Sequence, residues 1–86
     1  MASIEKTLDE RGERYGSFDT HAVIAQDLKG VMFASPKWHK TTASQREALD
    51  MIAHKIGRIL NGDPHYADSR HDIAGYATLV EKELIG

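Results

Sequence analysis

The chain has 86 residues, a formal net charge of −2 and 28% charged residues. This is the composition of a folded globular domain, and a chain of this length holds one domain. The absence of cysteine excludes disulfides and thiolate metal sites. No Lys/Arg cluster is present, so we expect no general nucleic-acid binding.

No apolar run approaches the roughly 20 residues of a membrane span, and the first residues lack the apolar core of a signal peptide. We therefore expect a cytoplasmic protein without a membrane segment. Small helical domains often finish burying their apolar faces against another copy. A homo-oligomer, in the simplest case a dimer, is the expected assembly.

Ser3 is a suitable N-cap for a first, short and charged helix, with Ile4 and Leu8 as apolar contacts one turn apart. Gly12 is the expected end of this helix. The glycine-containing connection that follows carries Tyr15 and Phe18. We expect both rings to pack on the core; the alternative is a stacking platform for a base or ring.

A second helix is expected to begin after Ser17 or Asp19 and to reach about Ala34. His21 lies on its apolar side and is interpreted as a residue at the edge of the core. The helix carries a stripe at helical spacing, formed by Ile24, Leu28, Val31 and Met32.

Residues 35–43 interrupt the helical pattern, since Pro36 disfavours helix at the preceding residue. This loop contains Trp38, the only tryptophan. Its expected role is to close the end of a helical bundle. The alternative is contact with an anionic or aromatic ligand or with a partner.

The third helix, about 44–61, has the strongest amphipathic pattern in the chain. Ser44 and Glu47 fit a capping box at its start, and Asn61-Gly62 is expected to end it in a left-handed conformation. Its apolar face carries Leu49, Ile52, Ala53, Ile56, Ile59 and Leu60. The opposite stripe, which is either a solvated surface or a site, carries Glu47, Asp50, His54 and Arg58.

The last helix is expected from about Asp68 to Ile85, with Ile73, Ala77, Val80 and Leu84 as its buried stripe. Only about six residues join it to the third helix, so the two are antiparallel neighbours. The predicted fold is all-α: a small bundle of about four helices with a C-terminal antiparallel hairpin formed by residues 44–61 and 68–85.

This hairpin places Lys55 or Arg58 near Asp68 or Asp72. The arrangement is either an ion pair across the hairpin or part of a site for Mg²⁺ and phosphate. The candidate metal ligands are Asp50, Asp68 and Asp72. The candidate ligand-binding residues are Tyr15, His54, Lys55, Arg58 and His71, and the candidate partner surface contains Trp38 and Arg70.

Three stretches, 10–18, 45–64 and 68–77, together resemble a set of short phage and prophage proteins catalogued as a domain of unknown function. The resemblance covers nearly the whole chain and implies a phage origin, hence a phage-infected bacterial host. The relatives carry an aromatic residue, usually Trp, where this chain has Arg70. By helical phase Arg70 lies at the edge of the apolar stripe.

The chain also resembles, more loosely, the MazG-like all-α nucleotide pyrophosphohydrolases, which hold Mg²⁺ through ExxE and ExxD pairs on two helices. Here Glu47 with Asp50 and Asp68 with Asp72 are similar in kind, although both spellings differ. The resemblance implies Mg²⁺-dependent binding, or hydrolysis, of a nucleotide, with a dimer bringing the acid pairs together.

Three functional hypotheses follow. The first is a MazG-like protein that binds a nucleotide or another phosphate-bearing small molecule with Mg²⁺. The second is a non-enzymatic phage inhibitor, which binds a host defence protein, as anti-CRISPR proteins do, or sequesters a nucleotide signal. The third is a helical structural or regulatory module without a ligand.

Overall fold

The computed structural model describes residues 3–86, and in this range it contains helices and no strand. The predicted all-α fold is confirmed. The elements, in chain order, are α1 (Ile4–Tyr15), α2 (Phe18–Phe33), the short 3₁₀ helix η1 (Trp38–Lys40), α3 (Ala43–Asn61) and α4 (Asp68–Ile85). None of the described helices is long and apolar enough to cross a membrane.

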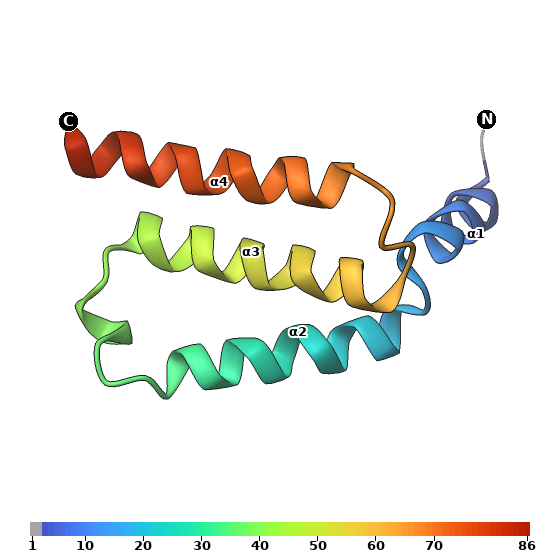
Figure 1. The fold of residues 1–86 in the computed structure, drawn as a ribbon. Coiled ribbons are helices and arrows are strands. Elements are labelled where there is room, and N and C mark those ends of the chain that lie inside the picture. Colours follow the sequence, from blue (N-terminus) through green and yellow to red (C-terminus); the bar gives the residue numbers. More distant parts are fainter. Residues whose placement is uncertain (1–2) are drawn as a thin grey trace.

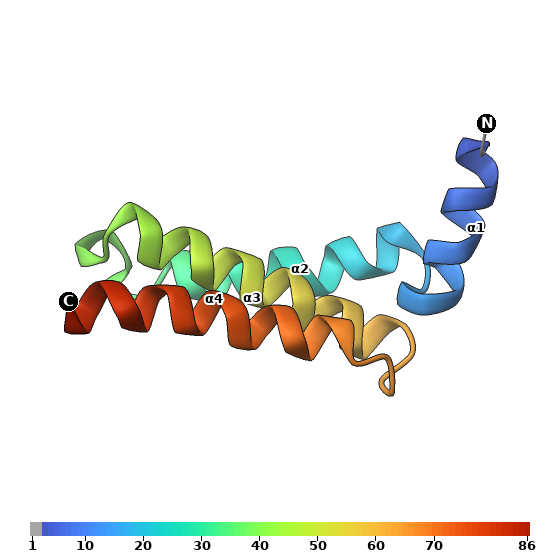
Figure 2. The same ribbon diagram turned by 90° about the horizontal axis from the view of Figure 1, so that it is seen from above.

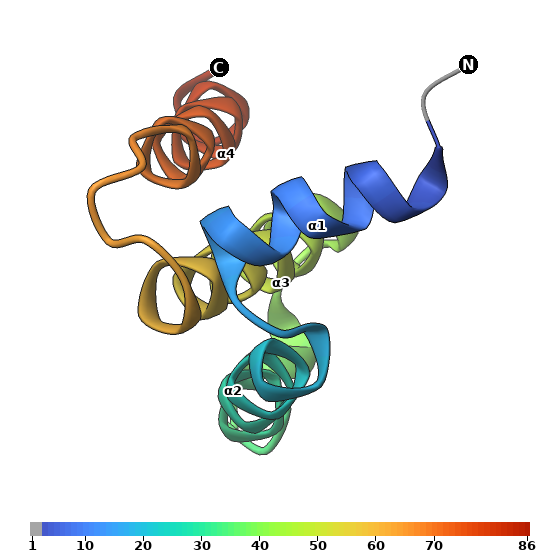
Figure 3. The ribbon, with the colours of Figure 1, turned by 90° about the vertical axis from the view of Figure 1, so that its right-hand side faces the viewer.

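Helices α2, α3 and α4 lie side by side, with α3 in the middle (Figures 1 and 3). Each runs antiparallel to its neighbour, so the predicted α3–α4 hairpin is confirmed. Helix α1 crosses one end of this layer and extends away from it (Figure 2). The molecule is therefore an open three-helix layer with a fourth helix across one end.

Ser3 caps α1 as predicted, because its hydroxyl accepts the N–H of Lys6 at 3.1 Å. The predicted end at Gly12 is wrong. The helix continues to Tyr15 and ends at Gly16, which has φ = 75°, in the left-handed region that glycine enters at low cost. A Cβ atom at Gly16 would also lie 2.2 Å from the Asn61 carbonyl oxygen, so this turn is built for close approach.

Asn61 fastens the α1–α2 turn to the end of α3. Its Nδ2 donates to the carbonyl oxygens of Tyr15 and Ser17, both at 2.8 Å. The predicted left-handed stop at Gly62 is wrong, since Gly62 has φ = −121°. Glycine is needed there for space instead, because a Cβ atom would lie 2.1 Å from the carbonyl oxygen of Arg14.

The N-terminus of α3 lies one residue earlier than predicted, and its cap is different. Thr42, not Ser44, is the N-cap, and it forms a capping box with Gln45. The sequence has the capping-box pattern twice, two residues apart, and the earlier copy is used. The side chain of Glu47 is therefore not occupied by a cap.

The core of the layer is thin. The buried apolar residues are Ala25, Trp38, Ala48 and Ala53, and of these Trp38 closes the loop end of the layer as expected. His21 is buried, as its interpretation as a core residue requires. Phe18 does not pack on the core as predicted, because 79% of its surface is exposed.

Candidate functional site

The polar stripe Glu47, Asp50, His54 and Arg58, which we call the polar face of α3, lines two hollows. Both lie between α2 and α3. The first, the arginine cavity, has a volume of about 470 Å³ and is closed at one end by α1. Its lining consists of Leu8, Arg11, Gly12, Tyr15, Gly16, Ser17, Phe18, His21, His54 and Arg58.

Three of the predicted ligand-binding residues, Tyr15, His54 and Arg58, line this cavity. The guanidinium carbon of Arg58 lies 4.3 Å from the centre of the Tyr15 ring, a cation–π contact. Tyr15 also meets Tyr66 edge-on, with ring centres 6.1 Å apart. The Tyr15 ring therefore holds the Arg58 side chain in place. This contact differs from both roles predicted for Tyr15, which were packing on the core and stacking on a base or ring of a ligand.

His21 and His54 form a pair in the wall of the cavity. Nε2 of His21 lies 3.3 Å from Nδ1 of His54, and the two rings meet edge-on. Burial lowers the pKa of His21. It also lowers the pKa of His54 to about 4, with the neighbouring His21 and Arg58 adding to the effect. Both imidazoles are therefore neutral at pH 7 and act as hydrogen-bonding groups.

The charge of the arginine cavity has one sign. Arg11 and Arg58 contribute two guanidinium groups, and within the described part of the chain no Asp or Glu lines the cavity. A guanidinium binds carboxylate and phosphate oxygens in a bidentate manner. The cavity is therefore suited to an anion, and the nearby aromatic rings suit a ligand that also has a flat apolar part.

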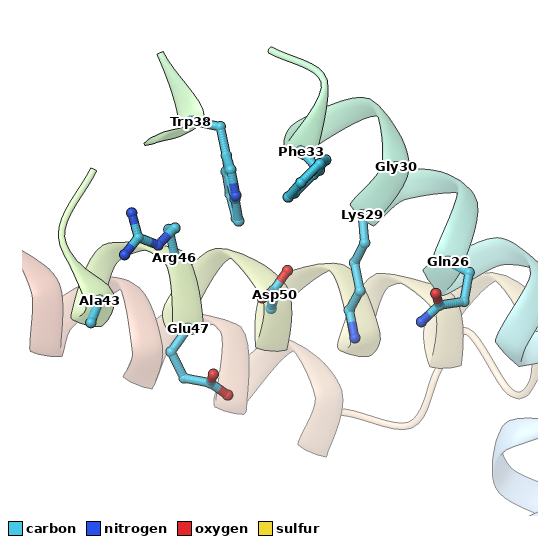
Figure 4. Close-up of a pocket in the computed structure, with 9 residues that line it drawn as sticks. All are labelled: Gln26, Lys29, Gly30, Phe33, Trp38, Ala43, Arg46, Glu47 and Asp50. Atoms are coloured by element: carbon cyan, nitrogen blue, oxygen red, sulfur yellow. The ribbon is translucent and has the colours of Figure 1, made fainter. Parts of the chain in front are cut away.

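The second hollow, the Trp38 groove, is more open, with a volume of about 640 Å³ (Figure 4). The rings of Trp38 and Phe33 flank a space whose floor carries Asp50, with Arg46 on the tryptophan side and Lys29 on the other. Glu47, free of the predicted capping role, also lines the groove. This groove is lined by both positive and negative side chains, unlike the arginine cavity.

The three predicted metal ligands lie in three different environments. Asp50 is in the Trp38 groove. Asp68 accepts a hydrogen bond from the Tyr66 hydroxyl at 2.8 Å, which raises the pKa of Tyr66. Asp72 forms an ion pair with Lys55, Nζ to Oδ2, at 3.0 Å. Among residues 3–86, no three His, Asp or Glu side chains are close enough to share a metal ion.

The ion pair confirms the prediction that Lys55 meets Asp72 across the hairpin. Lys55 is buried and engaged there, whereas Arg58 points to the arginine cavity. His71 is exposed beside a shallow hollow on α4 with Gly75 and Leu79. The structure thus separates His54 and Arg58 from His71 and the α4 carboxylates.

The two residues predicted for a partner surface differ in exposure. Arg70 is exposed, and its Nη1 donates to the carbonyl oxygen of Pro64 at 2.6 Å. Trp38 is buried and presents only part of its indole to the Trp38 groove.

Sequence reasoning did not assign Arg11 or His21 to the site, and it gave Phe18 only the alternative role of a stacking platform. Arg11 lies on a helix that was expected to end one residue later, and His21 was assigned to the core. One signal was available: Gly57, one residue before Arg58, leaves room on α3 for a large side chain from α2. His21 occupies that room.

The fold and the site define a small all-α protein with a cavity lined by two arginines at the junction of three helices. The chain matches, over residues 2–84, the model of a domain of unknown function, DUF6378, and belongs to this family. No curated protein and no solved structure matches the chain.

Proposed function

We propose that the protein binds a phosphate-bearing small molecule with an aromatic ring, with a nucleotide as the expected case, in the arginine cavity. The observation that supports this is the lining: two guanidinium groups, two neutral imidazoles, the rings of Tyr15 and Phe18, and no carboxylate. A volume of about 470 Å³ lies in the range of small-molecule sites.

Each group has a role in this proposal. Arg58, held by the Tyr15 ring, and Arg11 bind the phosphate oxygens. His54 uses Nδ1 toward His21, which leaves Nε2 for the ligand. The exposed ring of Phe18 at the rim stacks on the base.

Mg²⁺ does not fit a site made by one chain, because Asp50, Asp68 and Asp72 lie apart. We therefore propose that any Mg²⁺ arrives on the phosphates of the ligand. Binding alone suffices to withdraw a nucleotide signal in a phage-infected bacterium. Hydrolysis would begin from the same complex. Analysis of the nucleotide after incubation therefore distinguishes binding alone from hydrolysis.

The test is binding of nucleoside mono-, di- and triphosphates, with and without Mg²⁺, measured by calorimetry and by the rise in melting temperature. Arg58→Gln is expected to weaken binding about tenfold or more, the effect of one charge-assisted contact. Arg70→Gln removes the same charge on α4, away from the cavity, and is expected to bind like the wild type. Absence of binding across the panel, or equal loss in both variants, would disprove the proposal.

A further inference from the structure

The apolar side of α3 is only partly covered by the other helices, since Ile52 and Ile56 are half-buried and its two leucines are exposed. Leu49, Ile52, Ile56 and Leu60 lie opposite the polar face of α3, at about 100° per residue, and we call this side the open face. Helices α2 and α4 lie beside α3 and not over it (Figure 3), and α1 lies on the polar side, where it lines the arginine cavity. Leu49 and Leu60 are consequently 39% and 68% exposed.

The open face continues into a groove of about 520 Å³ between α3 and α4. Among residues 3–86, Glu81 is the only charged residue in its lining, which otherwise consists of Thr41, Gln45, Ala48, Leu49, Ile52, Ala77, Val80, Leu84 and Ile85. Depletion of charge at the centre with polar groups around it is typical of protein–protein interfaces. The groove is therefore suited to another apolar protein surface.

The dimensions of the whole chain point the same way. Its accessible surface is 6301 Å², whereas a compact monomer of this mass exposes about 5,100 Å². Its radius of gyration is 14.8 Å, against about 12 Å for a compact domain of this length. Helix α1, which has no buried residue, accounts for part of the difference. The excess of about 1,200 Å², part of which belongs to α1, is comparable with the roughly 800 Å² that one partner buries in a standard interface.

We infer that a second copy of this chain covers the open face, so that the α3–α4 groove meets its own counterpart in a two-fold symmetric dimer. The thin core argues for a copy rather than a different protein. Of the four buried apolar residues in the described range, three are alanines, which supply little hydrophobic stabilisation. Because this core is weak, the partner must be present whenever the chain folds. Another copy of the chain meets that condition.

The test uses two leucines of α4 with nearly equal exposure. Leu84 is 66% exposed and lines the groove, whereas Leu79 is 61% exposed and lies on the other side of the helix. Light scattering after size exclusion is expected to give twice the chain mass of 9.6 kDa for the wild type. Leu84→Glu is expected to halve that mass, and Leu79→Glu to leave it unchanged.

A measurement on the wild type alone keeps the inference testable if Leu84→Glu does not fold. The melting temperature of a dimer rises with protein concentration, and that of a monomer does not. A monomeric wild type, or a concentration-independent melting temperature, would overturn the inference, even if the open face then bound a different protein. A dimer broken by Leu79→Glu and not by Leu84→Glu would overturn it as well.

Discussion

Gly57 of α3 has no side chain at the point where the His21 ring of α2 packs against it. A Cβ atom on Gly57 would lie 2.9 Å from Nδ1 of His21 and 3.0 Å from its Cε1. The missing side chain on α3 is therefore what lets the buried imidazole approach, and the same approach brings His21 to His54. The glycine connects the packing of two helices with the wall of the arginine cavity.

Gly57→Ala is expected to destabilise the protein. Alanine gains about 1 kcal/mol over glycine in a helix, but forcing an extra carbon into a packed site costs about 1–3 kcal/mol. The net loss should be about 1 kcal/mol in urea unfolding, since the His21 ring is buried and cannot easily move.

Gly75→Ala is the matched control for this substitution. Gly75 also lies inside a helix, but a Cβ atom there meets no atom within 4 Å among the described residues. Gly75→Ala should therefore stabilise the protein by about 0.5–1 kcal/mol. Equal effects of the two substitutions would contradict the close contact between Gly57 and His21.

The histidine pair predicts a loss of stability in acid. Because burial lowers the pKa of His54 to about 4, the unfolded chain binds more protons than the native one between pH 6.5 and 4. The free energy of unfolding therefore has its full value above pH 6.5 and falls as the pH falls through this window. After allowance for the partial exposure of His54, the loss from pH 7.5 to 5 should be about 1 kcal/mol.

Urea midpoints at pH 7.5 and 5 measure this loss, and His54→Gln is the control. The variant lacks the titrating group but keeps the carboxylates, whose protonation affects both proteins alike. Its midpoint should change less between the two pH values. An identical pH dependence of variant and wild type would show that folding does not lower the pKa of His54.

The Lys55–Asp72 pair predicts unequal effects of removing its two members. The side chain of Lys55 is 11% exposed, whereas that of Asp72 is 43% exposed. Asp72→Ala leaves a buried ammonium without its partner and should cost about 1–3 kcal/mol. Lys55→Met keeps the apolar stem and leaves a carboxylate that water can reach, so its cost should stay below about 1 kcal/mol. Equal costs in thermal or urea unfolding would contradict this asymmetry.

The local signals in the sequence predicted the helices well. Ser3, the break near Pro36 and the short connection before Asp68 led to four helices close to their observed places. The packing was less predictable, because α3 has neighbours on two sides. Its buried positions toward them include Ala53, Gly57 and Lys55, and of these only Ala53 belongs to the predicted apolar face. Part of the predicted apolar stripe, above all Leu49 and Leu60, is instead exposed on the open face.

The site was predicted in part for a related reason. His54 and Arg58 follow from helical phase alone, since they share the polar face of α3 with Asp50. Which residues of α1 and α2 meet them depends on the α1–α2 turn. That turn is set by Asn61, 44 residues beyond Ser17 in the sequence, and by the left-handed Gly16. Local patterns carry no information on contacts of that separation.

The start of α3 provides the sharpest test of one local assignment. Thr42 and Ser44 both begin a capping-box pattern, and the structure uses Thr42, whose hydroxyl accepts the N–H of Gln45 at 3.2 Å. Thr42→Ala should therefore cost about 1 kcal/mol, while Ser44→Ala, inside the first turn, should change stability by less than about 0.5 kcal/mol. The urea midpoints of the two variants measure the difference. A larger loss for Ser44→Ala would mean that α3 begins at Ser44 in solution, which would occupy Glu47 and remove it from the Trp38 groove.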